Sequence, residues 1–469
     1  MTRRAPTAPS RRALLAGAAA LPAAAALPLP LRAQEEAGHD ALVAAQSDLI
    51  FGGPDDFVAA VKLISDRGNP DMAAGLIQAL RFSRAPSQVL VATLASITGE
   101  TAGEDWFDWM LWQELNPQVV PHPSYAEVKR AVYLRIDPNF DLFLKAPYLR
   151  RERMGIRVEE ITWGGVRKDG IPSLDDPELI AGAEADYLRD DDLVFGVEIN
   201  GDVRAYPLRI MGWHEMFNET IGGVPVALAY CTLCGAGILF ETDGYGRDAP
   251  FVFGSSGFLY RSNKLMFDRQ THSLWNQFTG KPVSGELWDA PIELRQRPVT
   301  IATWGDWRAA NPGTRALSLN TGHERDYGSG VVYQQYFASQ DLMFPAAVDQ
   351  TTHKQKDYVF GVRLPGAAKG WPLKVFEGGR VLNDAVGGRG AVLIGDAAQR
   401  TVRAYERGEE RFAAHPDGLA DETGAVWTLS EAALTAPDGR SRARLPGHIA
   451  YWFAWNGYLG VEAELYQDG

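Results

Sequence analysis

Cysteine is nearly absent from this chain: only Cys231 and Cys234 occur among its 469 residues. Two cysteines cannot build a disulfide framework, so the fold must be stabilised by its apolar core. Basic residues are also in the minority, with 46 lysines and arginines against 59 acidic residues and a formal net charge of −13. A nucleic-acid partner bound through overall positive charge is therefore not expected.

Several familiar catalytic motifs are missing as well. The sequence has no Gly-x-Gly-x-x-Gly after a strand pattern, no P-loop, no His-Glu-x-x-His and no Gly-x-Ser-x-Gly. Nucleotide chemistry and serine-hydrolase chemistry are therefore not expected.

Long apolar runs are confined to the N-terminus. The stretch Ser10–Leu15 (SRRALL) leads into an Ala/Leu/Pro-rich run that ends near Ala33, before the acidic Glu35 and Glu36. This pattern predicts a twin-arginine signal peptide over residues 1–33 and a periplasmic product. The alternative, a membrane anchor, is disfavoured because prolines interrupt the run, and the mature chain is expected to have no transmembrane helix. Because the twin-arginine route exports folded proteins, such a signal raises the expectation of a metal that is bound before export.

Residues 40–150 have apolar positions recurring every three or four residues, which predicts a helical domain. Within it, Trp106, Trp109 and Trp112 are three residues apart, a spacing typical of a packing stripe rather than a ligand cage. From about Ile156 the pattern changes to short β-branched and aromatic runs, and Asn200-Gly201 predicts a hairpin turn.

The β-rich part contains an internal repeat. Val194–Glu241 aligns without a gap on Val359–Glu406, an offset of 165 residues. The sequence therefore predicts an α+β protein with an N-terminal helical domain followed by two tandem homologous β-rich domains, at 155–345 and 346–469. Residues shared by both copies are explained by the common fold. The candidate metal ligands of the first copy are absent from the second: His214, Cys231 and Cys234 align with Gly379, Asp396 and Gln399, and in a later matching block His272 aligns with Gly424.

The cysteines lie in a strand pattern, Cys-x-x-Cys-Gly and a second strand pattern, which is typical of a metal knuckle. Thiolates with a neutral imidazole suit copper or zinc, so we expect a transition-metal site at His214, Cys231 and Cys234, with His272 as a further ligand candidate. Glu215 is a candidate base that would act beside the metal ligands without binding the metal itself. An open coordination position at the metal would allow catalysis. The alternatives are a disulfide that pins a hairpin, a thiol redox pair, or a non-enzymatic binding or assembly module with an unknown small-molecule or protein partner.

The sequence resembles the family catalogued as domain of unknown function 3179. The resemblance covers most of the mature chain and rests on Asp169–Pro177, Arg204–Pro207, His214-Glu215, Gly222–Val226, Tyr230–Gly235, Ser256–Tyr260, Asp268–Thr271 and Leu274-Trp275. Thr232 departs from the proline usual between the cysteines, and His272 stands where small or acidic residues are more usual, which weakens it as a ligand. The resemblance implies no known reaction, but it supports treating His214, Cys231 and Cys234 as one constellation.

Overall fold

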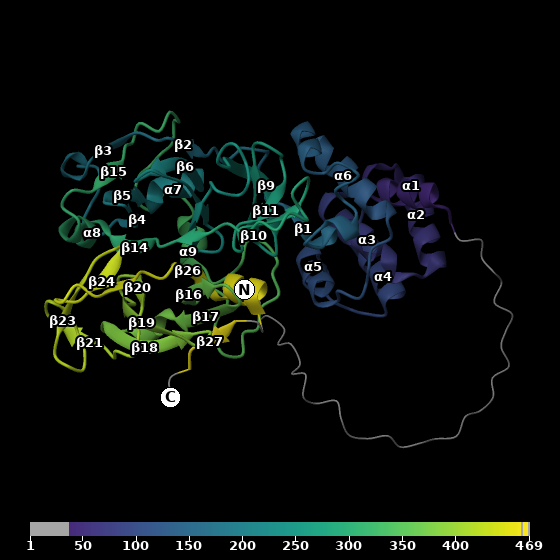
Figure 1. Ribbon diagram of the computed structural model, residues 1–469. Coiled ribbons are helices and arrows are strands. Elements are labelled where there is room, and N and C mark those ends of the chain that lie inside the picture. Colours follow the sequence, from purple (N-terminus) through teal and green to yellow (C-terminus); the bar gives the residue numbers. More distant parts are fainter. Residues whose placement is uncertain (1–36, 461–462, 468–469) are drawn as a thin grey trace, which may run out of the picture.

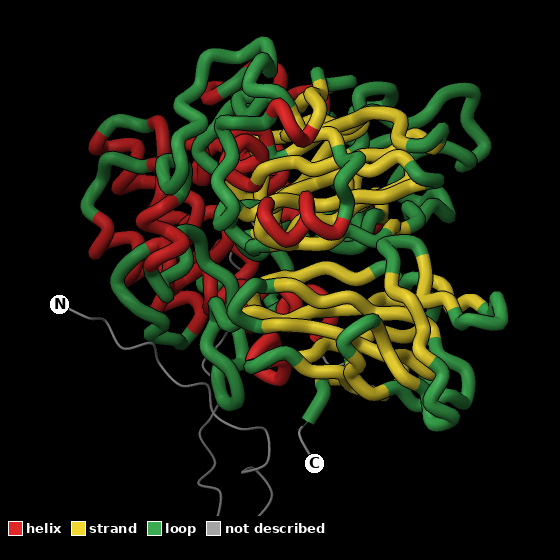
Figure 2. Tube along the Cα trace, turned by 90° about the vertical axis from the view of Figure 1, so that its left-hand side faces the viewer, coloured by secondary structure: helices red, strands yellow, loops and turns green. Residues whose placement is uncertain are grey.

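The computed structural model describes residues 37–460 and 463–467, so the expected signal peptide at 1–33 lies outside the described residues. The chain forms a helical domain and two β-rich units. Figure 1 shows the helical domain beside the first unit, with the second unit below the first, and Figure 2 shows the strands of the two units in two stacked groups. None of the described helices combines the length and apolar character needed to cross a membrane.

The helical domain agrees with the predicted 3.6-residue periodicity. Its helices are α1 (His39–Phe51), α2 (Pro54–Arg67), α3 (Ala73–Phe82), α4 (Ser87–Thr98), α5 (Trp106–Leu115) and α6 (Ser124–Ile136). Asp105 caps α5: its carboxylate accepts hydrogen bonds from the backbone N–H groups of Phe107 and Asp108 at 2.9 and 3.2 Å. Trp109 is fully buried, and Trp106 and Trp112 pack against the same core, which confirms the packing stripe.

The first β-unit contains three five-stranded sheets. The first has the order β14-β4-β5-β15-β3 and the second β13-β8-β7-β6-β2; the third, β1-β9-β10-β11-β12, also packs against the helical domain. The strands are β1 (Ile161–Trp163), β2 (Leu174–Asp175), β3 (Leu179–Ala181), β4 (Leu193–Ile199), β5 (Asp202–Pro207), β6 (Met216–Ile221), β7 (Val224–Cys231), β8 (Ala236–Glu241), β9 (Phe253–Tyr260), β10 (Asn263–Asp268), β11 (Leu274–Asn276), β12 (Lys281–Ser284), β13 (Gln296–Arg297), β14 (Thr300–Thr303) and β15 (Arg315–Leu317).

The second β-unit also has three sheets, with the orders β26-β16-β17-β27, β18-β19-β20 and β21-β22-β23-β24-β25. Its strands are β16 (Tyr358–Leu364), β17 (Ala367–Pro372), β18 (Arg380–Val386), β19 (Arg389–Asp396), β20 (Thr401–Glu406), β21 (Ala413–His415), β22 (Gly418–Ala420), β23 (Val426–Leu429), β24 (Ala433–Thr435), β25 (Ser441–Ala443), β26 (Gly447–Tyr451) and β27 (Glu464–Leu465).

Both units contain a hairpin at the same relative position, β4–β5 in the first unit and β16–β17 in the second. In the first unit Asn200 and Gly201 have φ values of 51° and 82°, as the Asn-Gly pair predicts for a type I′ turn. The strand bounds of β4, β5, β7 and β8 recur in β16, β17, β19 and β20 at the 165-residue offset. Gly222 and Gly223 also share their φ values, 54° and 80°, with Gly387 and Gly388.

In each unit a helix follows one of the last two strands. A tryptophan ring of that helix packs against a glycine in a neighbouring strand. Helix α8 (Trp304–Ala310) follows β14, and helix α10 (Trp452–Leu459) follows β26. An added Cβ on Gly196 would lie 2.2 Å from the Trp307 ring, and one on Gly361 would lie 1.8 Å from the Trp455 ring. Only glycine at these positions lets the indoles approach the strands so closely.

The two units meet through matching contacts. The backbone N–H of Tyr451, at the end of β26, donates to the carbonyl of Cys234 at 2.7 Å. At the corresponding place in the other unit, the Thr401 hydroxyl donates to the carbonyl of Ile301 at 2.8 Å. Because the cysteine turn forms part of this boundary, it is packed by side chains of both units.

The segment between the units, residues 318–357, carries the short helix α9 (Gln334–Ala338) and no strand. It starts after β15 and runs back across the first unit before β16 begins. Three of its tyrosines, Tyr327, Tyr333 and Tyr336, contact the first unit through their hydroxyl groups. We call Tyr327–Tyr336 the tyrosine segment.

Candidate functional site

The two cysteines lie in the tight turn between β7 and β8, as the strand-turn-strand pattern predicts. The turn is closed by the Cys234 N–H donating to the Cys231 carbonyl at 3.1 Å and the Gly235 N–H donating to the Thr232 carbonyl at 3.2 Å. Gly235 has the expected positive φ, 60°. The two Sγ atoms are 2.6 Å apart, so the pair can form a disulfide, with an S–S bond of about 2.05 Å, after little movement.

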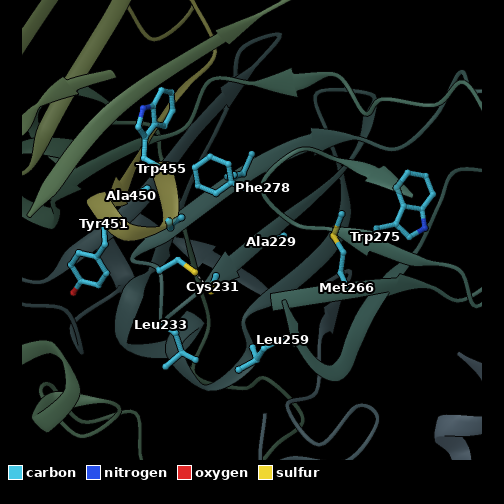
Figure 3. Close-up of a cluster of buried hydrophobic side chains, with 14 of the residues drawn as sticks. Ala229, Cys231, Leu233, Leu259, Met266, Trp275, Phe278, Ala450, Tyr451 and Trp455 are labelled. Carbon is cyan, nitrogen blue, oxygen red and sulfur yellow. Dashed lines mark hydrogen bonds between the residues drawn. The ribbon is translucent and has the colours of Figure 1, made fainter. Parts of the chain in front are cut away.

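Both sulfurs are buried. The exposed fraction is 2% for Cys231 and 0% for Cys234, and the surrounding cluster includes Leu233 and aromatic residues of the second unit. Figure 3 shows Tyr451 and Trp455 on the same side of this cluster as Cys231. Burial raises the pKa of the Cys234 thiol well above its usual value, with the neighbouring Cys231 adding to the shift. Reduced Cys234 is therefore held as a neutral thiol rather than as a thiolate.

A buried ion pair lies directly beside the cysteine turn. Helix α7 (Leu208–His214) is capped at its C-terminus by Glu215, which has a φ of 55°. The Glu215 carboxylate points toward the cysteine turn. This carboxylate accepts a hydrogen bond from the Thr232 hydroxyl at 2.7 Å and pairs with the Lys264 ammonium at 3.2 Å. Glu215 and Lys264 are 6% and 4% exposed. The sequence analysis expected Glu215 near the cysteines. In the structure the Glu215 carboxylate contacts the cysteine turn through the Thr232 hydroxyl.

Lys264 was missed by the sequence reasoning, although a signal was present. It lies in β10 directly before the apolar run Leu265–Phe267, and a lysine is rarely buried without a partner. A lysine in such a position needs a buried partner of opposite charge, and Glu215 is that partner.

His214 is held away from the cysteines by two hydrogen bonds of its own. Its Nδ1 lies 2.9 Å from the Pro172 carbonyl and its Nε2 lies 2.6 Å from the Tyr327 hydroxyl. Because a carbonyl only accepts, Nδ1 carries the proton and Nε2 accepts from Tyr327. Burial lowers the pKa of His214 to about 4, and the nearby His323 and Arg325 act in the same direction. The imidazole is therefore neutral and fully hydrogen-bonded.

His272 takes a different place again. It sits in the turn between β10 and β11 with a φ of 58°, and its ring stacks on Phe267 at 6.1 Å between centroids. Among the described residues, no group of three or more His, Cys, Asp or Glu side chains comes together in a way that could hold a metal ion.

The donors present at the cysteine turn do not fit the expected copper or zinc site. A tetrahedral zinc site uses four ligands and a typical copper site uses three, whereas the turn offers two thiols. The structure brings Cys231 and Cys234 together, brings Glu215 beside them, and does not bring His214 or His272 to them.

The tyrosine segment covers this region and was not anticipated from the sequence. Tyr336 donates to the carbonyl of Leu233, between the cysteines, at 2.6 Å, and Tyr333 donates to the Glu215 carboxylate at 3.4 Å. Together with the bond from Tyr327 to His214, the segment is attached to the end of α7 and to the cysteine turn. The segment therefore forms part of the cover over the cysteine turn.

The neutral His214 predicts a loss of stability in acid. In the unfolded chain a histidine has a pKa near 6.5, whereas in the fold that of His214 is about 4. A lowered folded pKa means that the stabilisation is complete above pH 6.5 and is lost as the pH falls toward 4, by up to about 3 kcal/mol. His214→Gln should reduce the slope of unfolding free energy against pH in that window, measured by urea denaturation. Equal slopes for wild type and variant would contradict the neutral, buried imidazole.

These features define a two-unit β protein with a buried cysteine pair and a helical domain at its N-terminal side. The model of the family described as "Protein of unknown function (DUF3179)" matches residues 168–461, a range that spans most of both β-units. The chain belongs to this family. No curated protein and no solved structure matches the chain.

Proposed function

We propose that the chain is a thiol–disulfide redox protein whose centre is the Cys231–Cys234 pair. The observation that carries the proposal is the 2.6 Å separation of the two sulfurs in a turn that holds both on one side. In the reaction, the two thiols and a partner disulfide are converted into the Cys231–Cys234 disulfide and two partner thiols. Two electrons pass to the partner, and both protons leave with its thiols.

Proton removal is the difficult step in such a buried site, because a thiol attacks only as its thiolate. Burial raises the pKa of Cys234, so a nearby base is required. We assign this role to Glu215, whose carboxylate is hydrogen-bonded to Thr232 between the two cysteines. The Lys264 ammonium pairs with that carboxylate at 3.2 Å inside the core and balances its charge.

Exchange with a partner also requires access. Cys231 and Cys234 are almost fully buried, and the Tyr336 hydroxyl holds the Leu233 carbonyl between them. A partner disulfide must therefore displace the tyrosine segment before a cysteine sulfur can attack it. The absence of a third ligand at the turn is the reason why we favour this function over the copper or zinc site expected from the sequence.

Two further parts of the sequence prediction enter as proposals. The residues 1–33 are proposed to direct export by the twin-arginine route, which would place the pair in an oxidising compartment where disulfides persist. The two β-units are proposed to descend from one duplicated ancestor, supported by their equal strand bounds at the 165-residue offset. In this view the second unit has lost the cysteines and retains the packing.

The redox proposal is tested by counting thiols in protein recovered from the periplasmic fraction. Because the chain has no other cysteine, every thiol that is counted belongs to the pair. Titration against oxidised and reduced dithiothreitol should convert two thiols to none with a defined midpoint, while Cys231→Ser should keep one thiol throughout. Both states should interconvert without unfolding, as monitored by circular dichroism.

Three results would contradict the proposal. Thiols that stay free at every redox poise would remove the redox pair. A disulfide that is reduced only after unfolding would make it a fixed staple. Stoichiometric metal that is lost in His214→Ala would restore the Cys/Cys/His site, and absence of the protein from the periplasmic fraction would contradict export.

A further inference from the structure

A cavity of about 820 Å³ is lined in part by Arg209 of α7. It is separate from the redox centre, because neither cysteine, nor Glu215, nor Lys264 lines it. Its walls come from α7, from the residue Tyr187 and from the loop that follows β15. The lining residues are Tyr187, Arg209, Leu319, His323, Glu324, Arg325, Asp326, Tyr327 and Gly328.

Arg209 faces this cavity with unused hydrogen-bonding capacity. One terminal nitrogen donates to the Tyr187 carbonyl, and the nearest carboxylate, that of Asp192, is 3.9 Å away. The Arg209 Nε is buried and has no partner among the described residues. A buried guanidinium N–H without an acceptor is costly, so an acceptor supplied by a ligand would be stabilising.

Arg325 lines the same cavity and also lacks a carboxylate partner within the described part of the chain. Its Nη1 donates to the backbone carbonyl of Glu324 at 2.9 Å, and its guanidinium lies 5.9 Å from the Trp213 ring centroid. Two other arginines of this unit are paired with carboxylates: Arg269 with Asp175 at 2.7 Å and Arg315 with Asp202 at 2.8 Å.

The acidic residues of the lining do not neutralise these two arginines. Glu324 and Asp326 are exposed, and the Asp326 carboxylate is engaged by the Gly328 N–H at 2.8 Å. The nearby His214 responds to the cations of this region, since His323 and Arg325 both contribute to its lowered pKa. The cavity therefore has two underused guanidinium groups and two tyrosines, Tyr187 and Tyr327.

We propose that this cavity binds a small organic anion through its carboxylate or phosphate group, with Arg209 and Arg325 as the charge partners. A planar guanidinium matches the two oxygens of a carboxylate or phosphate, which is why arginine is preferred for such ligands. The aromatic rings of Tyr187 and Tyr327 supply the apolar side of the site. The proposal does not rest on the redox proposal, because Cys231, Cys234, Glu215 and Lys264 do not line the cavity; the two regions meet only at Tyr327 and Gly328 of the tyrosine segment.

The test uses thermal unfolding and isothermal titration of the full chain with inorganic phosphate and, separately, with succinate. Sodium chloride at equal ionic strength corrects for screening. At least one of the two anions should raise the unfolding midpoint beyond the chloride control, and the stronger arm identifies the class. Arg209→Gln should weaken binding at least tenfold, and Arg325→Gln, a change in an exposed loop, should do so even if Arg209→Gln folds poorly.

Arg308→Gln is the matched control. Arg308 lies on α8 in the same unit, outside the cavity, and is already paired with Asp190 at 3.1 Å. It should leave the affinity unchanged. The proposal is overturned if neither anion stabilises the protein beyond chloride, or if Arg308→Gln weakens binding as much as Arg325→Gln does.

Discussion

Gly361→Ala should lower the free energy of unfolding by about 3 kcal/mol, because the new methyl group has no space. Its Cβ would lie 1.8 Å from Cζ3 of Trp455, whose ring is itself 2% exposed and packed in the boundary between the units. The backbone of β16 or the indole must move to relieve this overlap. Urea denaturation monitored by tryptophan fluorescence measures the loss.

The corresponding change in the first unit, Gly196→Ala, should give a penalty of similar size. Its Cβ would lie 2.2 Å from Trp307, which is fully buried and anchored by a hydrogen bond from its Nε1 to Thr314 at 2.9 Å. If the units share one architecture, equal penalties follow from equal packing. A penalty in one unit alone would show that the indole plays different roles in the two.

Gly457→Ala provides a control on the same helix as Trp455. An added Cβ at Gly457 meets no atom within 4 Å, and the residue lies inside α10. Alanine is the better helix former by up to about 1 kcal/mol, so this variant should be as stable as the wild type or more so. If Gly361→Ala lowers the free energy of unfolding and Gly457→Ala does not, the loss is due to overlap with the indole and not to a general effect of adding a methyl group.

The sequence predicts the local elements well, because local structure depends on local patterns. The periodicity of α1 to α6, the turn at Asn200-Gly201 and the strand-turn-strand pattern around the cysteines each require only neighbouring residues. The bounds of β16, β17, β19 and β20 also lie where the 165-residue offset from β4, β5, β7 and β8 predicts them.

The candidate site was harder to predict, because its contacts join distant parts of the chain. His214 bonds to Pro172 and Tyr327, which are 42 and 113 residues away, and Lys264 is 49 residues from Glu215. The positive φ of Glu215 reverses the chain at the end of α7, so that His214 and Glu215 are held by different partners. The sequence suggested a single group that contains His214, Glu215 and the cysteines. In the fold Glu215 contacts the cysteine turn, whereas His214 bonds to Pro172 and Tyr327.

Lys264→Met should lower the free energy of unfolding by about 3 kcal/mol or more, the second large effect that we expect. The ammonium group is the charge partner of Glu215, and its removal leaves a carboxylate that is 8% exposed without a counter-ion. Breaking a buried pair on one side typically costs about 3–5 kcal/mol, because the remaining charge keeps its desolvation penalty. Urea denaturation at pH 7 measures the change.

The double variant Glu215→Gln/Lys264→Met separates the charge from the shape of the site. Removing both charges should restore most of the lost stability, since no uncompensated charge remains and the methionine retains the apolar stem. The same variant tests the assignment of Glu215 as the proton acceptor: it should fold, yet its thiols should react with a disulfide more slowly than those of the wild type.

Lys62→Met on α2 is the matched control for the lysine substitution. Lys62 pairs with Asp66 at 2.6 Å, closer than Lys264 to Glu215, but the two side chains are 73% and 50% exposed. Water screens such a pair, so its removal should change stability by less than about 0.5 kcal/mol. Burial, rather than distance, then accounts for the difference between the two lysines. An equally mild effect of Lys264→Met would mean that water reaches Glu215, and a solvated carboxylate would not serve as the buried proton acceptor beside Cys231 and Cys234.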